Sequence, residues 1–232
     1  MSTGLGVFVT GTDTGVGKTL VSCALLHRLH GQHAKVVGMK PVAAGAQRTA
    51  LGWDNDDVRA LRAASSLRVP VELDNPYLLP EAISPHLAAR RAGQLIDIAL
   101  IVERYRSLAA LGDAVVVEGS GGFCVPLTDT HTGADLAQAL QLPVVLVVAL
   151  RLGCLSHALL TQEAIRARGL VLAGWVVNRI DPTMAAQEEN VATLRSWLQA
   201  PLLGDIPWLQ RPQADRLKLA LPGELMRRQV SA

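Results

Sequence analysis

The sequence predicts an α/β fold, a single domain in which helices cover both faces of a mostly parallel β-sheet. Short, continuously apolar runs alternate along the chain with segments of helical spacing, which is typical of such a sheet. The apolar runs lack the alternation of a half-exposed strand, and this favours strands buried on both faces. The chain has 232 residues, 50% of them hydrophobic, enough to build one large core.

Strands are expected where apolar and β-branched residues form short runs. In chain order these runs are 6–10, 35–40, 114–118, 143–150, 171–178 and 201–206. Helices are expected at 18–30, 54–64, 86–92, 95–110, 134–140, 156–168 and 185–198. Ser84 followed by Pro85 is typical of an N-cap and a first helical residue, which places the start of the third helix. Residues 211–232 are rich in Arg and Gln with weak periodicity, so no element is assigned to them.

Composition narrows the class of protein. The formal net charge is +2 and the basic residues form no stripe, so nothing supports nucleic-acid binding. The apolar run 142–150 is too short to span a bilayer, and the N-terminus carries no charged-then-apolar leader. Cys23, Cys124 and Cys154 have unrelated spacings that fit neither a disulfide framework nor a metal site. We therefore expect a cytoplasmic protein that binds neither nucleic acid nor membrane.

A glycine-rich stretch, GTDTGVGKT at residues 11–19, follows the first strand and opens the first helix. It is close to the G-x-x-x-x-G-K-[ST] pattern of a phosphate-binding loop, but its first glycine stands at position 11 instead of 12. Glycines let backbone N–H groups turn toward an anion, and the helix N-terminus adds partial positive charge. The alternative is a strand–helix turn without a ligand. The loop predicts a P-loop NTPase-like domain, in which Lys18 contacts the terminal phosphates and the Thr19 hydroxyl binds Mg²⁺.

Carboxylates that could bind Mg²⁺ stand at two places. Glu118 ends the 114–118 strand, where an ionised group is costly without a cation, although its loop could instead solvate it. Asp54, Asp56 and Asp57 cluster ahead of a helix. One of the three is expected to cap the helix and another could bind metal, and spacing alone does not choose between them.

Lysine is scarce: of the 22 basic residues only Lys18, Lys35, Lys40 and Lys218 are lysines, and the others are arginines. Lys40 ends the second strand, and ligands of parallel sheets bind beyond the carboxyl ends of strands. A second ammonium group facing a phosphate site would neutralise charge that develops during transfer. The alternative is an ordinary surface lysine.

The base of the nucleotide is left open by the residues themselves. Asn178-Arg179-Ile180-Asp181 ends a strand and is similar to the N-K-x-D by which GTPases read guanine. A strand-end Asn could also bind adenine through its amide, or could simply favour a turn.

The chain resembles the dethiobiotin synthetase family over roughly residues 7 to 209. The resemblance is carried by segments that fall in the family's order: GTDTGVGKT (11–19), KPVA (40–43), NPY (75–77), SPH (84–86), VEGSGG (117–122), LGCLSH (152–157), GWVVN (174–178) and APLLGDIPW (200–208). It implies a reaction in which ATP, CO₂ and 7,8-diaminononanoate (diaminopelargonate) give dethiobiotin, ADP and phosphate. A substrate amine captures CO₂ as a carbamate, the γ-phosphate activates it as a mixed anhydride, and the second amine closes the ureido ring.

By position, the resemblance implies roles for residues of this chain. Lys40, Lys18 and Thr14 are the catalytic set, and the metal ligands are Thr19, Asp57 and Glu118, which selects Asp57 from its cluster. Substrate binding falls to Ala44, Gly153 and Ser156, and the substrate carboxylate is held across a homodimer interface. The nucleotide-binding residues are Gly15, Val16, Gly17, Lys18, Thr19, Leu20, Asp57, Glu118, Gly119, Ser120, Gly121, Asn178, Arg179, Pro207, Trp208 and Leu209.

Three positions depart from the family's pattern. Gly15 stands where Glu is known, Ala44 where a substrate-contacting Ser is common, and Ser156 where Asn occurs. These departures bear on substrate affinity and leave the Lys, Thr and carboxylate set in place. Two other functions are possible for such a loop. One is a switch-type ATPase of the partitioning kind, but these proteins usually have a lysine where this chain has Thr12, which argues against it. The other is a related ATP-dependent ligase with another substrate.

Overall fold

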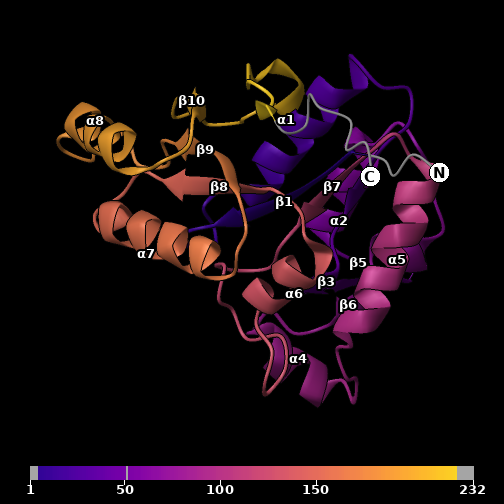
Figure 1. Ribbon diagram of the computed structural model, residues 1–232. Coiled ribbons are helices and arrows are strands. Elements are labelled where there is room, and N and C mark those ends of the chain that lie inside the picture. The colour runs from indigo at the N-terminus through magenta and orange to yellow at the C-terminus, as the bar shows by residue number, and fades with distance from the viewer. Residues whose placement is uncertain (1–4, 51, 224–232) are drawn as a thin grey trace.

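The computed structural model describes residues 5–50 and 52–223. Its centre is a six-stranded, entirely parallel sheet with the strand order β10-β9-β8-β1-β7-β2 (Figure 1). The expected α/β class with a mostly parallel sheet is therefore confirmed. The strands are β1 (Leu5–Gly11), β2 (Val36–Met39), β7 (Ala114–Glu118), β8 (Val144–Ala149), β9 (Leu172–Asn178) and β10 (Leu202–Ile206).

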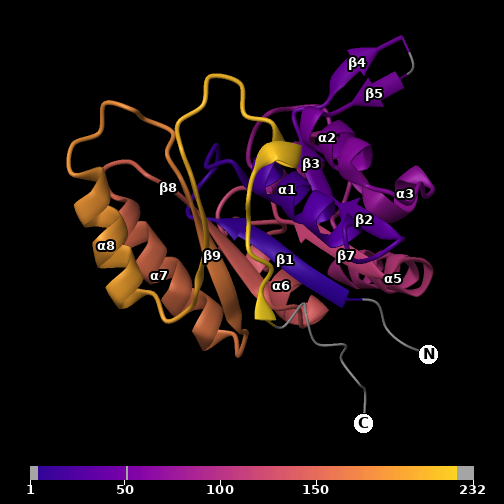
Figure 2. The same ribbon diagram turned by 90° about the horizontal axis from the view of Figure 1, so that it is seen from above.

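Helices cover both faces of the sheet, as Figure 2 shows most clearly. On one face, Val21 and Leu61 pack over Val9 and Val116. They belong to α1 (Lys18–His30) and α2 (Asp56–Ala64). The helices of the other face are α5 (Ile98–Leu111), α6 (Gly133–Leu140), α7 (Cys154–Ala167) and α8 (Gln187–Trp197). The continuously apolar strands are thus explained, because side chains on both sides of them are buried.

The register brings the carboxyl ends of four strands to one edge of the sheet. Val9 of β1 lies beside Glu118, Gly11 beside Val147, and Ala149 beside Asn178. The loops that follow these strands therefore emerge side by side, at the edge where parallel sheets bind ligands.

Two pairs of short strands between β2 and α5 were not expected from the sequence. Strand β3 (Val42–Ala44) pairs in parallel with β6 (Tyr77–Leu79), and β4 (Gln47–Thr49) pairs antiparallel with β5 (Gly52–Asp54). The short helix α3 (Val71–Asp74) was not expected either, whereas α4 (Pro85–Arg91) corresponds to the helix expected at 86–92. Strands of three residues are too short for a two-residue period to be recognised.

Several expected boundaries are corrected. The helix expected at 54–64 begins at Asp56, because Asp54 belongs to β5. Its cap is Asn55, whose side-chain oxygen accepts from the N–H groups of Asp57 and Val58, and not one of the three Asp residues. Ser84 does stand at the N-cap position before Pro85, but its side chain makes no capping hydrogen bond. The helix expected at 95–110 begins at Ile98, capped by the Asp97 side chain.

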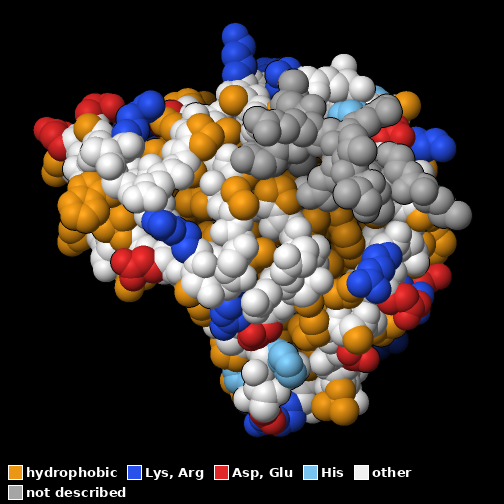
Figure 3. Space-filling model, viewed as in Figure 1, with side chains coloured by type: hydrophobic (Ala, Val, Ile, Leu, Met, Phe, Trp, Pro, Cys, Tyr) orange, Lys and Arg blue, Asp and Glu red, His pale blue; other side chains and the backbone are white. Residues whose placement is uncertain are grey.

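The segment from 211 onward has structure up to residue 223. A 3₁₀ turn, η1 (Ala214–Arg216), lies against α1, and the N–H of Ala220 donates to the carbonyl of Leu203 at 2.8 Å. Residues 224–232 lie outside the described residues. Within the described chain, no helix combines the length and apolar character that crossing a bilayer requires. On the face seen in Figure 3, acidic and basic side chains are interspersed.

Candidate active site

The glycine-rich loop joins β1 to α1 and is fixed from several sides. The N–H of Thr14 donates to Asp13 Oδ1 at 2.7 Å, and Arg151 forms an ion pair with Asp13 Oδ2. The ammonium group of Lys18 folds back onto the carbonyl of Asp13 at 3.0 Å. Gly15 and Gly17 have φ angles of 74° and 94°, which L side chains rarely adopt. The loop therefore has the left-handed turns and the helix N-terminus that a phosphate cradle requires.

Asn178 holds this loop from behind. Its Nδ2 donates to the carbonyl of Val16 at 3.0 Å and is buried. A Cβ on Gly17 would meet the same Nδ2 at 2.2 Å, so a side chain there would push Asn178 off the loop. The end of β9 and the phosphate loop thus form one packed unit.

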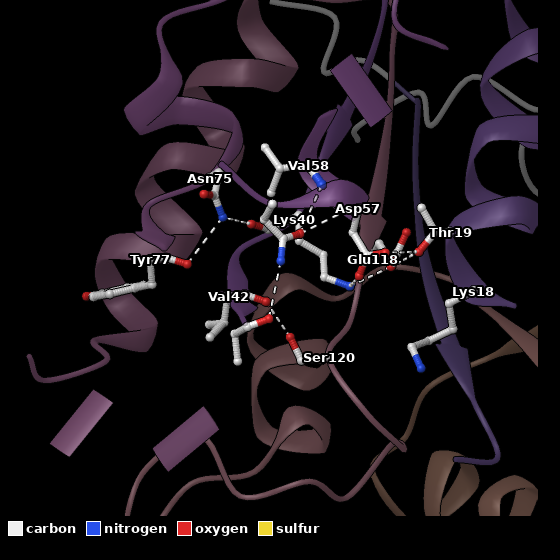
Figure 4. A network of polar contacts seen from close by, with 12 residues as sticks. Lys18, Thr19, Lys40, Val42, Asp57, Val58, Asn75, Tyr77, Glu118 and Ser120 are labelled. Carbon is white, nitrogen blue, oxygen red and sulfur yellow. Dashed lines mark hydrogen bonds and ion pairs between the residues drawn. The ribbon is translucent and has the colours of Figure 1, made fainter. Parts of the chain in front are cut away.

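Two carboxylates and one lysine meet at the neighbouring strand ends (Figure 4). Lys40 Nζ lies 2.9 Å from Asp57 Oδ2 and 2.5 Å from Glu118 Oε1. Thr19 Oγ1 lies 2.8 Å from Asp57 Oδ1 and 2.9 Å from Glu118 Oε1. Asp54 and Asp56 instead pair with Arg59 on the surface of α2. Of the three clustered Asp residues, the fold brings Asp57 to Lys40 and Glu118.

The charges in this cluster hold one another ionised. Burial works against the ammonium form of Lys40, but attraction to Glu118 and Asp57 outweighs it and raises the pKa of Lys40. Burial also works against the ionised form of Asp57 and would raise its pKa, but Lys40 and the hydroxyl of Thr19 outweigh burial and lower the pKa of Asp57. Within the described residues, Lys18 forms no ion pair: burial and repulsion from Lys40 outweigh the attraction of Glu118 and Asp57 and lower its pKa to about 8. An anion placed between the two lysines would stabilise the charge of Lys18.

The same oxygens fit a magnesium ion. The single Thr19 proton cannot serve both carboxylates at once, and Glu118 Oε2 is buried without a hydrogen-bond partner among the residues that the structure describes. A bound cation would stabilise both the carboxylate that the Thr19 proton does not reach and the unpartnered Glu118 Oε2. Among residues 5–50 and 52–223, no group of three or more His, Cys, Asp or Glu side chains could hold a metal alone. Mg²⁺ needs only one or two carboxylates, because phosphate and water oxygens complete its coordination.

These groups line a cavity of about 610 Å³. Its polar wall includes the phosphate loop, both lysines, Asp57 and Glu118, and its other wall is largely apolar. Ala82, Ile83 and Val125 belong to that apolar wall. The cavity has room for a triphosphate beside a small molecule with an aliphatic part. Sequence-predicted residues that line it are Thr14, Gly15, Gly17, Lys18, Thr19, Lys40, Ala44, Asp57, Glu118, Ser120 and Gly121.

Other predicted residues lie away from this cavity. Val16 is buried and Leu20 packs at the edge of the core, while a Cβ on Gly119 would meet the Phe8 ring at 3.0 Å. Gly153 and Ser156 are exposed at the start of α7. They do not line the cavity of their own chain.

A second hollow of about 420 Å³ lies beyond β10, and Pro207 and Leu209 line it. Trp208 is exposed beside it. Arg179 forms paired hydrogen bonds with Asp205 and a third with Glu188, and neither Asn178 nor Arg179 lines this hollow.

Some residues of the site carried no assigned role in the sequence. Asp13 and Arg151 fix the backbone of the phosphate loop. Ser120, which was predicted to bind the nucleotide, also donates its hydroxyl to the carbonyl of Val42. Asn75 bonds to the backbone of Lys40. The NPY segment that contains Asn75 was identified by its resemblance to the family. Apart from that resemblance, its proline was the local sequence feature that indicated a constrained backbone.

Solved structures share the fold. The signal recognition particle receptor FtsY from Elizabethkingia anophelis superposes with a TM-score of 0.52 and 16% identity, over 97% of this chain and 65% of that chain. A ParA family ATPase from Chlorobium tepidum also gives 0.52, with 14% identity over 90% and 86% of the two chains. At these identities the likeness concerns the fold alone.

Sequence comparison is far more specific. Residues 5–215 match a family model described as an AAA domain. The chain is 57% identical over 207 residues to the ATP-dependent dethiobiotin synthetase BioD of Ralstonia nicotianae, covering 89% of this chain and 90% of that protein. It is 52% identical to the protein of the same name from Aromatoleum aromaticum, covering 93% and 97%. This chain belongs to the ATP-dependent dethiobiotin synthetase family.

Proposed function

We propose that the cavity between the phosphate loop and Lys40 is where this chain makes dethiobiotin from 7,8-diaminononanoate, CO₂ and ATP. The chain is an ATP-dependent ligase of biotin biosynthesis, as its family membership implies. The observation that carries the assignment of the site is the meeting of Lys18, Lys40, Asp57 and Glu118 in one cavity that also has an apolar wall.

The first step joins CO₂ to the substrate. One amine of the diamine attacks the carbon of CO₂ and loses a proton, giving a carbamate. The methylene chain of the substrate would lie along Ala82, Ile83 and Val125, because apolar atoms leave water there. Ala44 also lines the cavity and offers no hydroxyl to the substrate.

The second step brings two anions together. A carbamate oxygen attacks the γ-phosphorus and ADP leaves, giving a carbamic–phosphoric anhydride. Lys18 and Lys40 would place positive charge on both sides of the reacting groups, which lowers their repulsion and holds them in line. Thr14 would bind the phosphate or the carbamate from the loop. Held by Thr19, Asp57 and Glu118, Mg²⁺ would neutralise charge on the phosphate oxygens.

Ring closure completes the reaction. The second amine attacks the carbonyl carbon of the anhydride, the C–O bond to phosphate breaks, and inorganic phosphate leaves. The result is a cyclic urea.

The nucleotide would extend from the phosphate loop toward β10. Gly15 to Leu20 and Gly119 to Gly121 would surround its phosphates, and Asn178, Arg179 and the 207–209 turn would hold adenine. The hollow lined by Pro207 and Leu209 supports the role of the 207–209 turn, whereas Asn178 and Arg179 do not line it. Asn178 would have to share its amide between the base and Val16.

A homodimer accounts for the position of Gly153 and Ser156. Both are exposed at the N-terminus of α7, and the dipole of a helix favours an anion at that end. In a dimer, these residues would bind the substrate carboxylate at the interface. The free thiols of Cys23, Cys124 and Cys154 agree with work in a reducing cytoplasm.

The test is a reconstituted reaction. The protein is incubated with Mg·ATP, bicarbonate and diaminononanoate, and the product is sought by mass as a cyclic urea. Omission of CO₂ or of the diamine should abolish phosphate release. Phosphate release that ignores the diamine would instead indicate a switch-type ATPase, and release with another diamine only would indicate a related ligase. Replacement of ATP by GTP or CTP decides the base.

A further inference from the structure

The backbone of Lys40 leaves the central sheet just where its side chain enters the site. Strand β2 ends at Met39, and β3, which belongs to a different sheet, begins at Val42. Pro41 between them has no N–H to donate. Lys40 itself is 5% exposed, so its N–H and carbonyl need partners from another part of the protein.

Both partners come from the segment at the end of α3. The N–H of Lys40 donates to the carbonyl of Asp74 at 2.8 Å. The carbonyl of Lys40 accepts from Asn75 Nδ2 at 2.6 Å, and the same nitrogen donates to the carbonyl of Tyr77 at 3.2 Å. Figure 4 shows the Asn75 amide between these two carbonyl groups. One side chain therefore fixes the peptide of Lys40 relative to β6.

Helix α2 connects this backbone support to the charged cluster. Arg62 on α2 pairs with the buried carboxylate of Asp74 through two hydrogen bonds of 2.8 and 2.5 Å. Asp57, five residues earlier on the same helix, pairs with the ammonium group of Lys40. Helix α2 is thus linked both to the backbone of Lys40, through Asp74, and to its ammonium group, through Asp57. These two links limit where Nζ can lie.

We propose that Asn75 is a positioning residue for catalysis, which acts by fixing the main chain of Lys40. The inference rests on the function proposed above for Lys40. Loss of the Asn75 donor leaves the Lys40 carbonyl buried without its partner. The peptide must then shift, and a displacement of about 1 Å of a catalytic group costs up to about a hundredfold in rate.

The experiment is a double-mutant cycle with Asn75→Ala and Lys40→Ala in the full-length protein, measured as kcat and KM for ATP together with thermal unfolding. Asn75→Asp keeps the size of the side chain and removes the donor, and it carries the test if Asn75→Ala does not fold. Gln162→Ala is the matched control. Gln162 is also a buried amide, and it bonds to the backbone of Trp197 and Gln199 away from the cavity.

Asn75→Ala and Asn75→Asp should lower kcat about ten- to a hundredfold, with KM for ATP changed by less than about threefold, because the phosphate loop is untouched. In the Lys40→Ala background, the same substitutions should change kcat by less than about twofold. Gln162→Ala should lower the unfolding temperature without lowering kcat. A normal kcat in folded Asn75 variants, or an equal loss in both backgrounds, would overturn the inference. A normal kcat in Lys40→Ala would instead remove the proposed function of Lys40.

Discussion

Lys40 Nζ lies 2.5 Å from Glu118 Oε1, and both side chains are buried. The lysine thus provides the positive charge that the carboxylates need before any metal arrives. Its removal leaves Glu118 and Asp57 without that cation, and a buried unpaired charge is strongly destabilising. We therefore expect Lys40→Met to bind Mn²⁺ in the absence of nucleotide at least about tenfold more tightly than the wild type, about 1.4 kcal/mol.

Calorimetry or electron paramagnetic resonance of Mn²⁺ measures this affinity directly. Lys18→Met is the control, since Lys18 bonds to the carbonyl of Asp13 and not to either carboxylate. Lys18→Met should raise the affinity for Mn²⁺ less than Lys40→Met does. Equal Mn²⁺ affinities in the wild type and Lys40→Met would show that the lysine and the metal do not compete.

Asp57 and Asp56 are adjacent in sequence and differ in surroundings. Asp57 contacts Thr19 and Lys40, whereas the side chain of Asp56 is 78% exposed and pairs with Arg59. Asp57→Asn should raise the Mg²⁺ concentration for half-maximal activity by about tenfold or more. Asp56→Asn should change it by less than about twofold. A titration of activity against Mg²⁺ at saturating ATP compares the two, and the reverse order would exclude Asp57 as the metal ligand.

The central sheet was predictable because its strands are buried on both faces and therefore appear as unbroken apolar runs. The parallel order then aligned the strand ends, so the phosphate loop, Lys40 and Glu118 could be expected at one edge before the structure was known. The sequence predicted the cap of α2 less well, because several adjacent polar side chains could make the same capping hydrogen bond. Asn55, not an Asp, caps α2, and no spacing rule distinguishes four adjacent polar residues.

The support of Lys40 could not be predicted from the residues alone. Asn75 lies 35 residues from Lys40, and they meet through the short β3–β6 pair, whose strands are too brief for periodicity. Gly153 and Ser156 pose a different problem, because the structure leaves them exposed and any ligand they bind must come from outside the chain's own cavity. Contacts between distant loops depend on the whole fold and not on local sequence.

Asp135 at the first turn of α6 gives a pH-dependent contribution to stability. Its Oδ2 accepts from Thr132 N at 2.6 Å and from Thr132 Oγ1 at 2.7 Å, and Arg168 pairs with its other oxygen. Burial works against these bonds, but Thr132 and Arg168 outweigh it and lower the pKa of Asp135 from 3.8. A carboxyl group whose pKa is lower in the folded state stabilises the fold at pH values above its unfolded-state pKa. That stabilisation is lost as the pH falls through its folded-state pKa.

We therefore expect Asp135→Asn to lower the free energy of unfolding by about 1 kcal/mol at neutral pH, the size of a helix-cap effect, and by progressively less below pH 4. Urea unfolding at several pH values measures it. Asp129→Asn is the control, because its ion pair with Arg90 is exposed and should contribute little. A difference between wild type and Asp135→Asn that is independent of pH would mean that its charge has no part in the effect.

Gly15 and Gly17 both have positive φ, but only Gly17 is crowded. A Cβ at Gly15 would meet no atom of the described residues within 4 Å, whereas one at Gly17 would meet Asn178 Nδ2 at 2.2 Å. Gly15→Ala should therefore cost only the backbone strain, about 1–2 kcal/mol of stability. Gly17→Ala should cost more, and it should also weaken ATP binding further, because Asn178 must release the carbonyl of Val16 and free the loop. Thermal unfolding and ATP titration of the two variants separate these effects. If Gly15→Ala and Gly17→Ala weaken ATP binding equally, the contact between Asn178 and the loop does not contribute to nucleotide affinity.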